Sequence, residues 1–398
     1  MKLDEVLARA KRALDKPAEF GPDLDISKFT VATGGDEFAL SKGRDRLSLV
    51  GIDLSEENRA GSYYQVDEKV IGASAKTPGL TVLPFEQALE EGFLENYVWK
   101  LVPPDLDKYT ALNAMHGRRG YVVIAERGRK IAEPVQTCLF MSSPRGIQVP
   151  HNVIIAEEDS ELSVYTGCTI MTEVVGLHAG VTEIYVKKGA RVNFVMLHAW
   201  NEDAHVRPRT AVLVEEGGTY VEHYINMTPV ASLQARPRVT LAGRGARAHL
   251  SSVIVAKKRS IMDFGGLIRL EGKETGGEII SRIIAKDSAK VTSRLRLEAS
   301  GIGCKGHTEC NGLMLSDSAQ ILTIPELLSS INDAELTHEA AVGKLKEEEI
   351  YYLTARGIKR DEAVAMLVRG FMNVKVEGLP PNLRRQIDIA VAMAAAGL

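Results

Sequence analysis

The residues best suited to chemistry lie between positions 301 and 344. This stretch contains Cys304 and Cys310, followed by the adjacent pair His338-Glu339. Thiolates and imidazoles bind soft and borderline metals, including the iron of iron–sulfur clusters, and a carboxylate adds a harder ligand. The same stretch connects a repetitive body to a helical tail. We therefore expect chemistry, or contact with a partner, at this connection.

The spacing Cys304-x-x-His307-x-x-Cys310 suggests a local metal site, but strand geometry argues against one. On a straight strand the two cysteines share a face yet lie roughly 20 Å apart, and His307 points to the opposite face. They could share one metal only if Gly303 and Gly306 bend the chain. We interpret the cysteines as contributors to a site that several coils or chains assemble.

The other two cysteines follow apolar runs. Cys138 lies within VQTCLFM and is most simply a small buried hydrophobic residue. Cys168 follows a glycine in YTGCT, and burial is the simpler interpretation there too. Most of the nine histidines alternate with apolar residues, as His198 does, which indicates scaffold or surface positions. We place His338-Glu339 at a strand-to-helix junction, where a structural and a functional role fit equally well.

Signatures of nucleotide chemistry are missing from the sequence. Residues 301–306, GIGCKG, match G-x-G-x-x-G, but the following HTECNGLML has a strand pattern where a dinucleotide site needs a helix. No G-x-x-x-x-G-K-[ST] motif and no nucleophile–histidine–acid pattern occurs. We predict that the chain is not an enzyme and has no nucleotide site, so that another chain supplies any nucleotide hydrolysis.

Composition excludes several classes of protein. The 49 basic and 52 acidic residues give a net charge of −3, which favours neither nucleic acid nor a membrane surface as a partner. Four cysteines in 398 residues are too few for a disulfide framework. No apolar run is long enough to span a bilayer, and the first residues lack the apolar core of a signal peptide. We expect a soluble cytoplasmic protein with reduced thiols.

A repeat organises the body of the chain from Gly120 to about Pro325. Short apolar runs alternate with small-residue turns whose first members lie 30, 28, 28, 43 and 30 residues apart. A period of this length, with strands and no intervening helix, favours a parallel β-helix over a β-sandwich. The turns are Asp159-Ser160, Gly189-Ala190, Gly217-Gly218, Gly245-Ala246, Ser288-Ala289 and Ser318-Ala319.

Helical patterns flank this body, where they could cap the β-helix or dock partners. We predict an N-terminal mixed helical region at 1–115, a parallel β-helix core at 116–343 and a C-terminal helical domain at 344–398. Expected extended pieces are 47–51 and 79–83, and expected helices are 1–15, 84–100, 105–115, 344–355, 360–371 and 382–395.

Several segments, in order, resemble the SufB/SufD family of iron–sulfur cluster assembly scaffolds over roughly residues 120–375. They are ELSVYTGC at 161–168, VNFVMLHAW at 192–200, KGHTECNG at 305–312, IPEL at 324–327, LTHEAAVGK at 336–344, YLTARG at 352–357 and Gly370-Phe371.

The resemblance implies a right-handed parallel β-helix whose C-terminal helices dock a SufC-type ABC ATPase. It also implies pairing through the β-helix, as a homodimer or as a SufB–SufD heterodimer. Cys168 matches the SufB cysteine that receives persulfide sulfur. His338 and Glu339 match the region where a transient iron–sulfur cluster forms, and the participation of flavin is left open.

Two departures from the family pattern affect the ligand set. Ala319 and Leu336 occupy positions where SufB and SufD respectively carry a cysteine. We therefore prefer a simplified SufB-like homodimer in which Cys304 or Cys310 replaces the missing ligand. A cluster-free SufD-like structural subunit is the alternative. A carbohydrate-active β-helix enzyme has little support, because aromatic residues make up 6% of the chain and only two are tryptophan.

Overall fold

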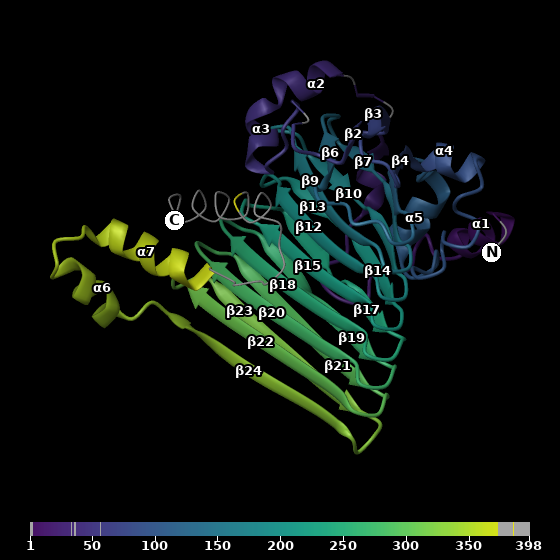
Figure 1. The fold of residues 1–398 in the computed structure, drawn as a ribbon. Coiled ribbons are helices and arrows are strands. Elements are labelled where there is room, and N and C mark those ends of the chain that lie inside the picture. Colours follow the sequence, from purple (N-terminus) through teal and green to yellow (C-terminus); the bar gives the residue numbers. More distant parts are fainter. Residues whose placement is uncertain (1–2, 33, 36, 56, 373–384, 386–398) are drawn as a thin grey trace.

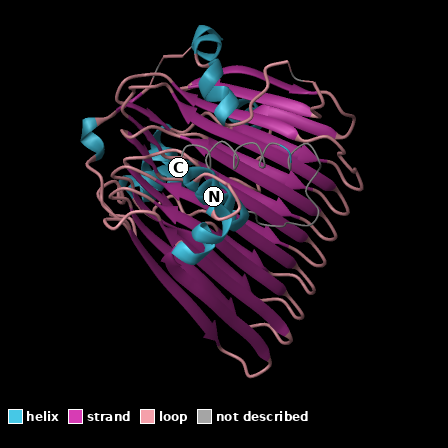
Figure 2. Ribbon diagram, turned by 90° about the vertical axis from the view of Figure 1, so that its left-hand side faces the viewer, coloured by secondary structure: helices cyan, strands magenta, loops and turns pink. Residues whose placement is uncertain are grey.

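The computed structural model describes residues 3–372, apart from 33, 36 and 56, together with residue 385. The chain forms a β-solenoid of about eight turns with helices near both ends, and strands account for 45% of residues against 17% for helices (Figure 1). The predicted mainly-β, parallel β-helix architecture is thus confirmed. Figure 2 shows the strands stacked coil upon coil, with the helices outside the stack.

One wall of the solenoid is a ten-stranded sheet. Neighbouring strands are parallel, except for the antiparallel pair β2–β3. Its order is β3 (Lys69–Ala75), β2 (Gly61–Val66), β6 (Val135–Met141), β9 (Glu161–Ile170), β12 (Arg191–Ala199), β15 (Thr219–Asn226), β18 (Arg247–Ala256), β20 (Gly276–Ala285), β22 (Cys304–Met314) and β24 (Ala334–Lys344).

The remaining strands form a fourteen-stranded sheet that folds round the other sides. One arm contains β1 (Thr30–Val31), β7 (Gly146–Gln148), β10 (Gly176–His178), β13 (Ala204–Val206) and β16 (Ser232–Ala235). The other contains β4 (Leu80–Pro84), β5 (Tyr121–Ala125), β8 (His151–Ala156), β11 (Val181–Val186), β14 (Arg209–Val214) and β17 (Arg238–Leu241). Both arms pair with the single long strand β19 (Ile261–Leu270). On its other side β19 pairs with β21 (Lys290–Ala299), which in turn pairs with β23 (Gln320–Ser329).

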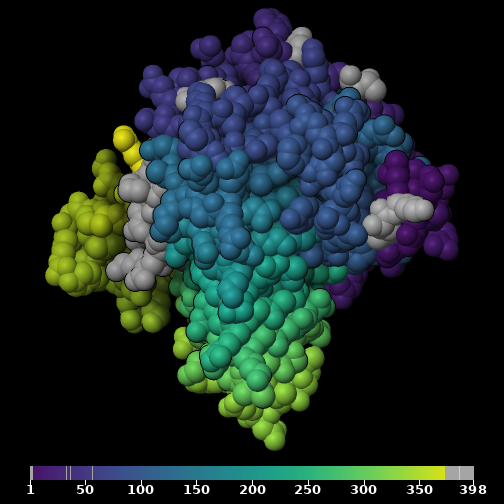
Figure 3. All heavy atoms as spheres, turned by 45° about the vertical axis from the view of Figure 1, so that its right-hand side comes forward, coloured from purple at the N-terminus to yellow at the C-terminus, as the bar shows by residue number. Residues whose placement is uncertain are grey.

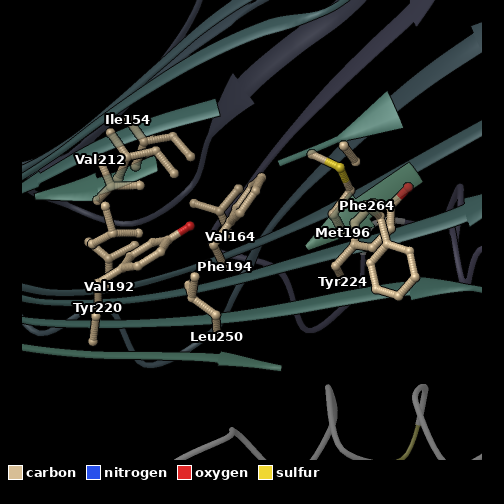
Figure 4. Packing of buried hydrophobic residues seen from close by; sticks show 14 of the residues in the cluster. Ile154, Val164, Val192, Phe194, Met196, Val212, Tyr220, Tyr224, Leu250 and Phe264 are labelled. Carbon is tan, nitrogen blue, oxygen red and sulfur yellow. The ribbon is translucent and has the colours of Figure 1, made fainter. Parts of the chain in front are cut away.

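Side chains on the inner faces of the strands form the main core. In the ten-stranded sheet Val164 and Phe194 are in register on neighbouring strands, as are Val192 and Tyr220. Figure 4 shows these four packed inside the solenoid, with Ile154 reaching in from the opposite wall. Because side chains alternate between faces along a strand, residues in register on neighbouring strands point to the same side of the sheet, so each inner-face position continues from coil to coil.

The predicted corners are confirmed. Asp159, Gly189, Gly217 and Gly245 all have positive φ, between 59° and 69°. The N–H of each donates to a carbonyl of the next coil, as in the 2.8 Å bond from Gly189 to Glu216. A small residue follows each corner because the chain turns there into the packed interior.

The N-terminal third differs from the prediction in two places. Residues 47–51, predicted to be extended, lie mainly in a helix, α3 (Arg44–Leu49). The helix predicted over 84–100 stops early as α4 (Phe85–Glu90), where Gly92 takes a φ of +79°. Beyond it the buried carboxylate of Glu183 accepts N–H bonds from all four residues of the loop 99–102, at 2.7–3.2 Å. These bonds satisfy the loop's donors without a helix.

Other flanking elements agree with the prediction. They are α1 (Leu3–Lys11), β4, α5 (Lys108–His116), α6 (Glu347–Thr354) and α7 (Arg360–Met372), alongside the short helices η1 (Ile26–Lys28) and α2 (Glu37–Lys42). Apart from residue 385, the helix expected at 382–395 lies outside the described residues.

The two ends of the solenoid are finished differently. At the first coil, the β2–β3 hairpin and β4 close the end, and N-terminal residues cover the outer faces (Figure 3). At the last coil, β24 pairs only with β22 and β23 only with β21 among the described strands. The described C-terminal helices pack beside the stack, with Val368 and Met372 on the outer face of the ten-stranded sheet. They do not cap the end, contrary to one role considered for them.

Candidate functional site

Cys168 lies in the first half of the solenoid, on the inner face of β9. Its side chain is fully buried, and its neighbours in register are Leu139 on β6 and His198 on β12. Burial, followed by the nearby Cys138, raises the pKa of the Cys168 thiol well above its ordinary value. The thiol is therefore neutral in this state. Cys138 faces the other way into a second apolar cluster, as expected for a small buried hydrophobic residue.

Unpaired polar atoms gather near Cys168. His198 accepts a hydrogen bond at Nδ1 from the Tyr224 hydroxyl, at 2.9 Å, if Nδ1 is unprotonated. Three buried atoms have no hydrogen-bond partner among the described residues: Nε2 of His198, Nε1 of Trp200 and Oδ1 of Asn226. Burial is the main cause that lowers the pKa of His198 well below its ordinary value, so this imidazole is neutral. A buried polar atom without a hydrogen bond lowers the stability of the fold, so this cluster is a candidate functional site.

The sequence interpretation missed His198 because it treated most histidines as scaffold. The signal was the repeat itself. Cys168 and His198 are in register across neighbouring coils, and their separation of 30 residues equals the distance between the corners at 159 and 189. Counting from the corners would have placed the imidazole beside the thiol.

Two separate pairs of hydrogen-bonded hydroxyl groups lie on the inner wall, one beside Cys168 and one nearer the last coils. Thr137 and Thr166 are hydrogen-bonded at 2.7 Å, and Ser252 and Ser281 at 2.8 Å. Ser281 is in register with Cys310 on β22. Five strand spacings separate β9 from β22, about 24 Å at about 4.8 Å each. Cys168 and Cys310 therefore cannot bind one metal within a chain.

Cys310 and His338 come close together at the far end. Both face the interior, and they lie one strand and two residues apart because Thr308 pairs with His338 and Cys310 with Ala340. Such diagonal neighbours have Cα atoms roughly 7–8 Å apart. Nδ1 of His338 is 3.0 Å from the Thr308 hydroxyl. Burial raises the pKa of the Cys310 thiol, against smaller opposing effects of Ser293 and Arg282.

Glu339 points away from His338. The two are consecutive on β24, so Glu339 projects outward, in register with Glu309. His338 and Glu339 both belong to β24, and α6 begins only at Glu347. The predicted strand-to-helix junction is therefore several residues further along than expected. One chain presents the imidazole and the carboxylate to opposite faces.

Cys304 occupies a corner. It follows Gly303, whose φ is +72°, and Sγ donates to the Gly301 carbonyl at 2.7 Å and lies 3.2 Å from the Thr275 hydroxyl. Thr275 follows the equivalent corner one coil earlier, so Cys304 fits here as a small buried residue. β22 is one continuous strand, as the argument against a local metal site required, and His307 faces outward to Thr337.

The described residues do not complete a metal site. No group of three or more His, Cys, Asp or Glu side chains within them is arranged to hold an ion. Of the five residues predicted for the site, the structure brings Cys310 and His338 together on the inner face of the last coils. It leaves Cys168, Cys304 and Glu339 apart from that pair.

The surroundings of the pair are open. Leu327 on β23 and Val342 on β24 face the interior, yet each is 41% exposed. Beyond them α6 and α7 present Tyr351, Tyr352 and Met366 to solvent. No helix among the described residues has the length and apolar character needed to cross a bilayer.

Comparison with known proteins is consistent with this architecture. The family model described as "SUF system FeS cluster assembly, SufBD core domain" matches residues 139–371. A protein of Methanothermobacter thermautotrophicus named as an iron–sulfur cluster assembly SufBD family protein is 38% identical over 409 residues, spanning both chains fully. One of the same name from Archaeoglobus fulgidus is 40% identical over 361 residues, 90% of this chain and 97% of its own. SufB of Bacillus subtilis is 29% identical over 351 residues, 85% of this chain and 74% of its own. The chain therefore belongs to the SufBD family of iron–sulfur cluster assembly proteins.

Proposed function

We propose that this chain is a cytoplasmic scaffold subunit that receives sulfur and iron and holds a nascent iron–sulfur cluster as its cargo. The main support for this proposal is that Cys310 and His338 share the inner face of the open last coils. The described residues of one chain do not form a complete metal site there. Ligands from a second chain would complete it. Membership of the family supports a role in cluster assembly, and the assignment of these residues is ours.

Sulfur acceptance would take place at Cys168. When the coil opens locally, the Cys168 thiol gives its proton to solvent, and the thiolate attacks the outer sulfur of a donor persulfide. A new S–S bond forms at Cys168, the donor S–S bond breaks, and the donor leaves as a thiolate. Burial shields the product from external thiols. It also requires a local opening of the coil for each transfer.

Pairing at the open end would bring two half-sites together. Among the described strands, β23 and β24 each have one unpaired edge, and they carry exposed apolar residues on the inner face. Such edges favour pairing with another chain. We prefer a homodimer; a heterodimer with a second family member is the other arrangement. Glu339 would then serve as a ligand only to a cluster reached from the outer face of its own strand.

A SufC-type ABC ATPase is the proposed partner of the C-terminal helices. Tyr351 and Tyr352 on α6 are 74% and 56% exposed, and Met366 on α7 is 50% exposed. Exposed aromatic residues of this size are common anchors of protein interfaces. In this proposal the N-terminal region is 1–115 and the β-helix core is 116–343. The domain that docks the ATPase is 344–398. The described residues offer no support for a bound flavin.

Anaerobic reconstitution with iron and sulfide tests the proposal. We expect Cys310→Ser and His338→Ala to lose most of the visible absorption of the cluster, and Cys304→Ser, a matched cysteine control on the same strand, to retain it. Cys168→Ser should still assemble a cluster from inorganic sulfide but not from a persulfide donor. An unchanged cluster yield in Cys310→Ser would end the assignment of Cys310 as a ligand.

A cluster-free structural subunit is the second candidate. It is favoured by Ala319 and Leu336, which stand at positions where the family pattern has cysteines, and by the outward direction of Glu339. Under that candidate, reconstituted protein would lack the visible band while still binding the ATPase stably. The same reconstitution experiment therefore separates the two functions.

A further inference from the structure

A hollow lies far from the cysteines, between the outer face of the fourteen-stranded sheet and the N-terminal segments that cover it. Its cavity volume is about 70 Å³. Three arginines line it: Arg209 at the start of β14, Arg236 between β16 and β17, and Arg238 at the start of β17. The covering side contributes residues near Phe20 and the loop at 101–107.

Two of these arginines have few hydrogen bonds. A guanidinium carries five N–H donors. Arg236 reaches Glu326 at 3.4 Å and Arg238 reaches Glu19 at 3.5 Å, both long for a charged pair. Nε of Arg236 is buried and has no partner within the described part of the chain. Their side chains are only 15% and 31% exposed. Burial is the largest cause lowering the pKa of both, so each charge is held at a cost.

The carboxylates of the hollow do not supply the missing acceptors. Asp107 is bound by Arg209 at 2.7 Å and also caps α5, and Asp263 is bound by Arg294 at 2.9 Å. Glu19 remains, but its side chain is 60% exposed. An anion of higher charge could displace it from Arg238.

Apolar groups complete the walls. Phe20 lies 4.9 Å from the guanidinium of Arg236 and 4.3 Å from that of Arg294, measured to the ring centroid. Val102, Pro103 and Ala235 form much of the remainder. Walls of this kind reduce the screening of the arginine charges by water and favour an anion that enters the hollow.

We propose that this hollow binds the phosphate group of a small molecule between Arg236 and Arg238. The two residues are separated by Pro237 and lie two positions apart, a spacing of about 7 Å along an extended chain. Two guanidinium forks at that spacing match a dianionic tetrahedral group, or two linked ones, better than a single carboxylate. The site lies on the outer wall, so it goes beyond cluster assembly and does not depend on it.

The bound phosphate would join the N-terminal covering to the solenoid. Glu19 and the 101–107 loop come from the N-terminal third, whereas the two arginines belong to the repeat body. Ligand binding should therefore slow amide hydrogen exchange in residues 18–24 and 99–107 while leaving the last coils unchanged.

Calorimetric titration with inorganic pyrophosphate and with orthophosphate, at ionic strength held constant with sodium chloride, tests the site. We expect the full-length chain to bind pyrophosphate, and Arg238→Gln to bind it at least about tenfold more weakly. Glu19→Gln should bind it more tightly, because the competing carboxylate is gone. Arg244→Gln is the matched control, since Arg244 pairs only with the exposed Glu274 outside the hollow and should leave affinity unchanged.

Three outcomes would overturn the proposal. They are an absence of binding above the sodium chloride baseline, wild-type affinity in Arg238→Gln, and citrate binding as tight as pyrophosphate. A thermal unfolding midpoint measured without ligand guards against misfolding. Because Arg238 makes one long contact, Arg238→Gln should unfold at or above the temperature of the unsubstituted chain. If Arg238→Gln proves unstable, the affinity of Glu19→Gln for pyrophosphate still tests the proposal, because it should be higher than that of the unsubstituted chain.

Discussion

An early coil of the solenoid and the last coil are built from one repeat, but their residues are buried to different extents. In β12 all nine residues except Arg191 are buried, because the interior lies on one side and N-terminal elements lie on the other. In β24 the same alternation leaves its residues half-buried or exposed. The inner-face residues His338 and Val342 belong to this uncovered strand. The comparison teaches that the fold is complete at one end and unfinished at the other, which is where a second chain or a cargo could add what is missing.

One pair of leucines measures this difference directly. Leu297 on β21 and Leu327 on β23 are in register on the same inner wall, but the first is fully buried and the second is 41% exposed. We expect Leu297→Ala to lower the free energy of unfolding by about 2–5 kcal/mol through the cavity it leaves. Leu327→Ala should cost about 1 kcal/mol or less. Urea denaturation of dilute protein checks both.

Equal losses for the two variants would contradict the comparison. A loss in Leu327→Ala that grows with protein concentration would sharpen it instead, because that leucine would then be buried by association.

Glu222 provides a test of burial in the covered part of the solenoid. It lies inside the solenoid and accepts a hydrogen bond from the Tyr220 hydroxyl at 2.7 Å. Burial raises its pKa from 4.5 to about 7. The folded protein therefore keeps a proton that the unfolded chain releases, so this group's contribution to stability is complete below pH 4.5 and is lost as pH rises toward 7. The loss amounts to at most about 3 kcal/mol. Denaturation of Glu222→Gln at acid and alkaline pH should show a smaller fall than the unsubstituted chain.

An equal fall in both proteins would mean that the interior around Glu222 is wetter than its burial indicates. Glu278 provides a control of opposite sign, because its hydrogen bond with His249 on the outer face holds its pKa below the ordinary value. Glu278→Gln should therefore not reduce the fall between acid and alkaline pH, and should slightly enlarge it.

The fold was largely predictable because its corners carry a local signal. Positive φ at Gly189, Gly217 and Gly245 demands glycine or another residue tolerant of that conformation, so the period is visible in the sequence. The errors arose where a pattern had two explanations. Leu47-Ser-Leu-Val alternates like a strand, yet it packs in the short helix α3. The helix at Phe85 was overextended because the Glu183 carboxylate that receives the next loop comes from a distant coil.

The site was harder to predict than the fold. The period alone could have placed His198 beside Cys168. It could not show that Cys304 sits in a corner, since Ser, Ala, Thr and Cys all fit there, or that His338 and Glu339 diverge. The weak apolar alternation of β24 resembled a junction because the strand is uncovered on both faces. Residues that await a partner chain lack the burial pattern by which strands are recognised.

The smallest expected effect on stability belongs to the open end. Val342 faces the interior on β24 but is 41% exposed, so Val342→Lys should change the free energy of unfolding of the single chain by only about 0.5 kcal/mol. If the end is an interface, the same lysine must be buried without a partner and should weaken association at least about tenfold. Sedimentation velocity over a range of concentrations measures this. Thr337→Lys, on the outer face of the same strand, is the control that should associate more nearly like the unsubstituted chain. Unchanged sedimentation of Val342→Lys would place the contact between chains elsewhere, and the half-site of Cys310 and His338 would then have to be completed by a different partner.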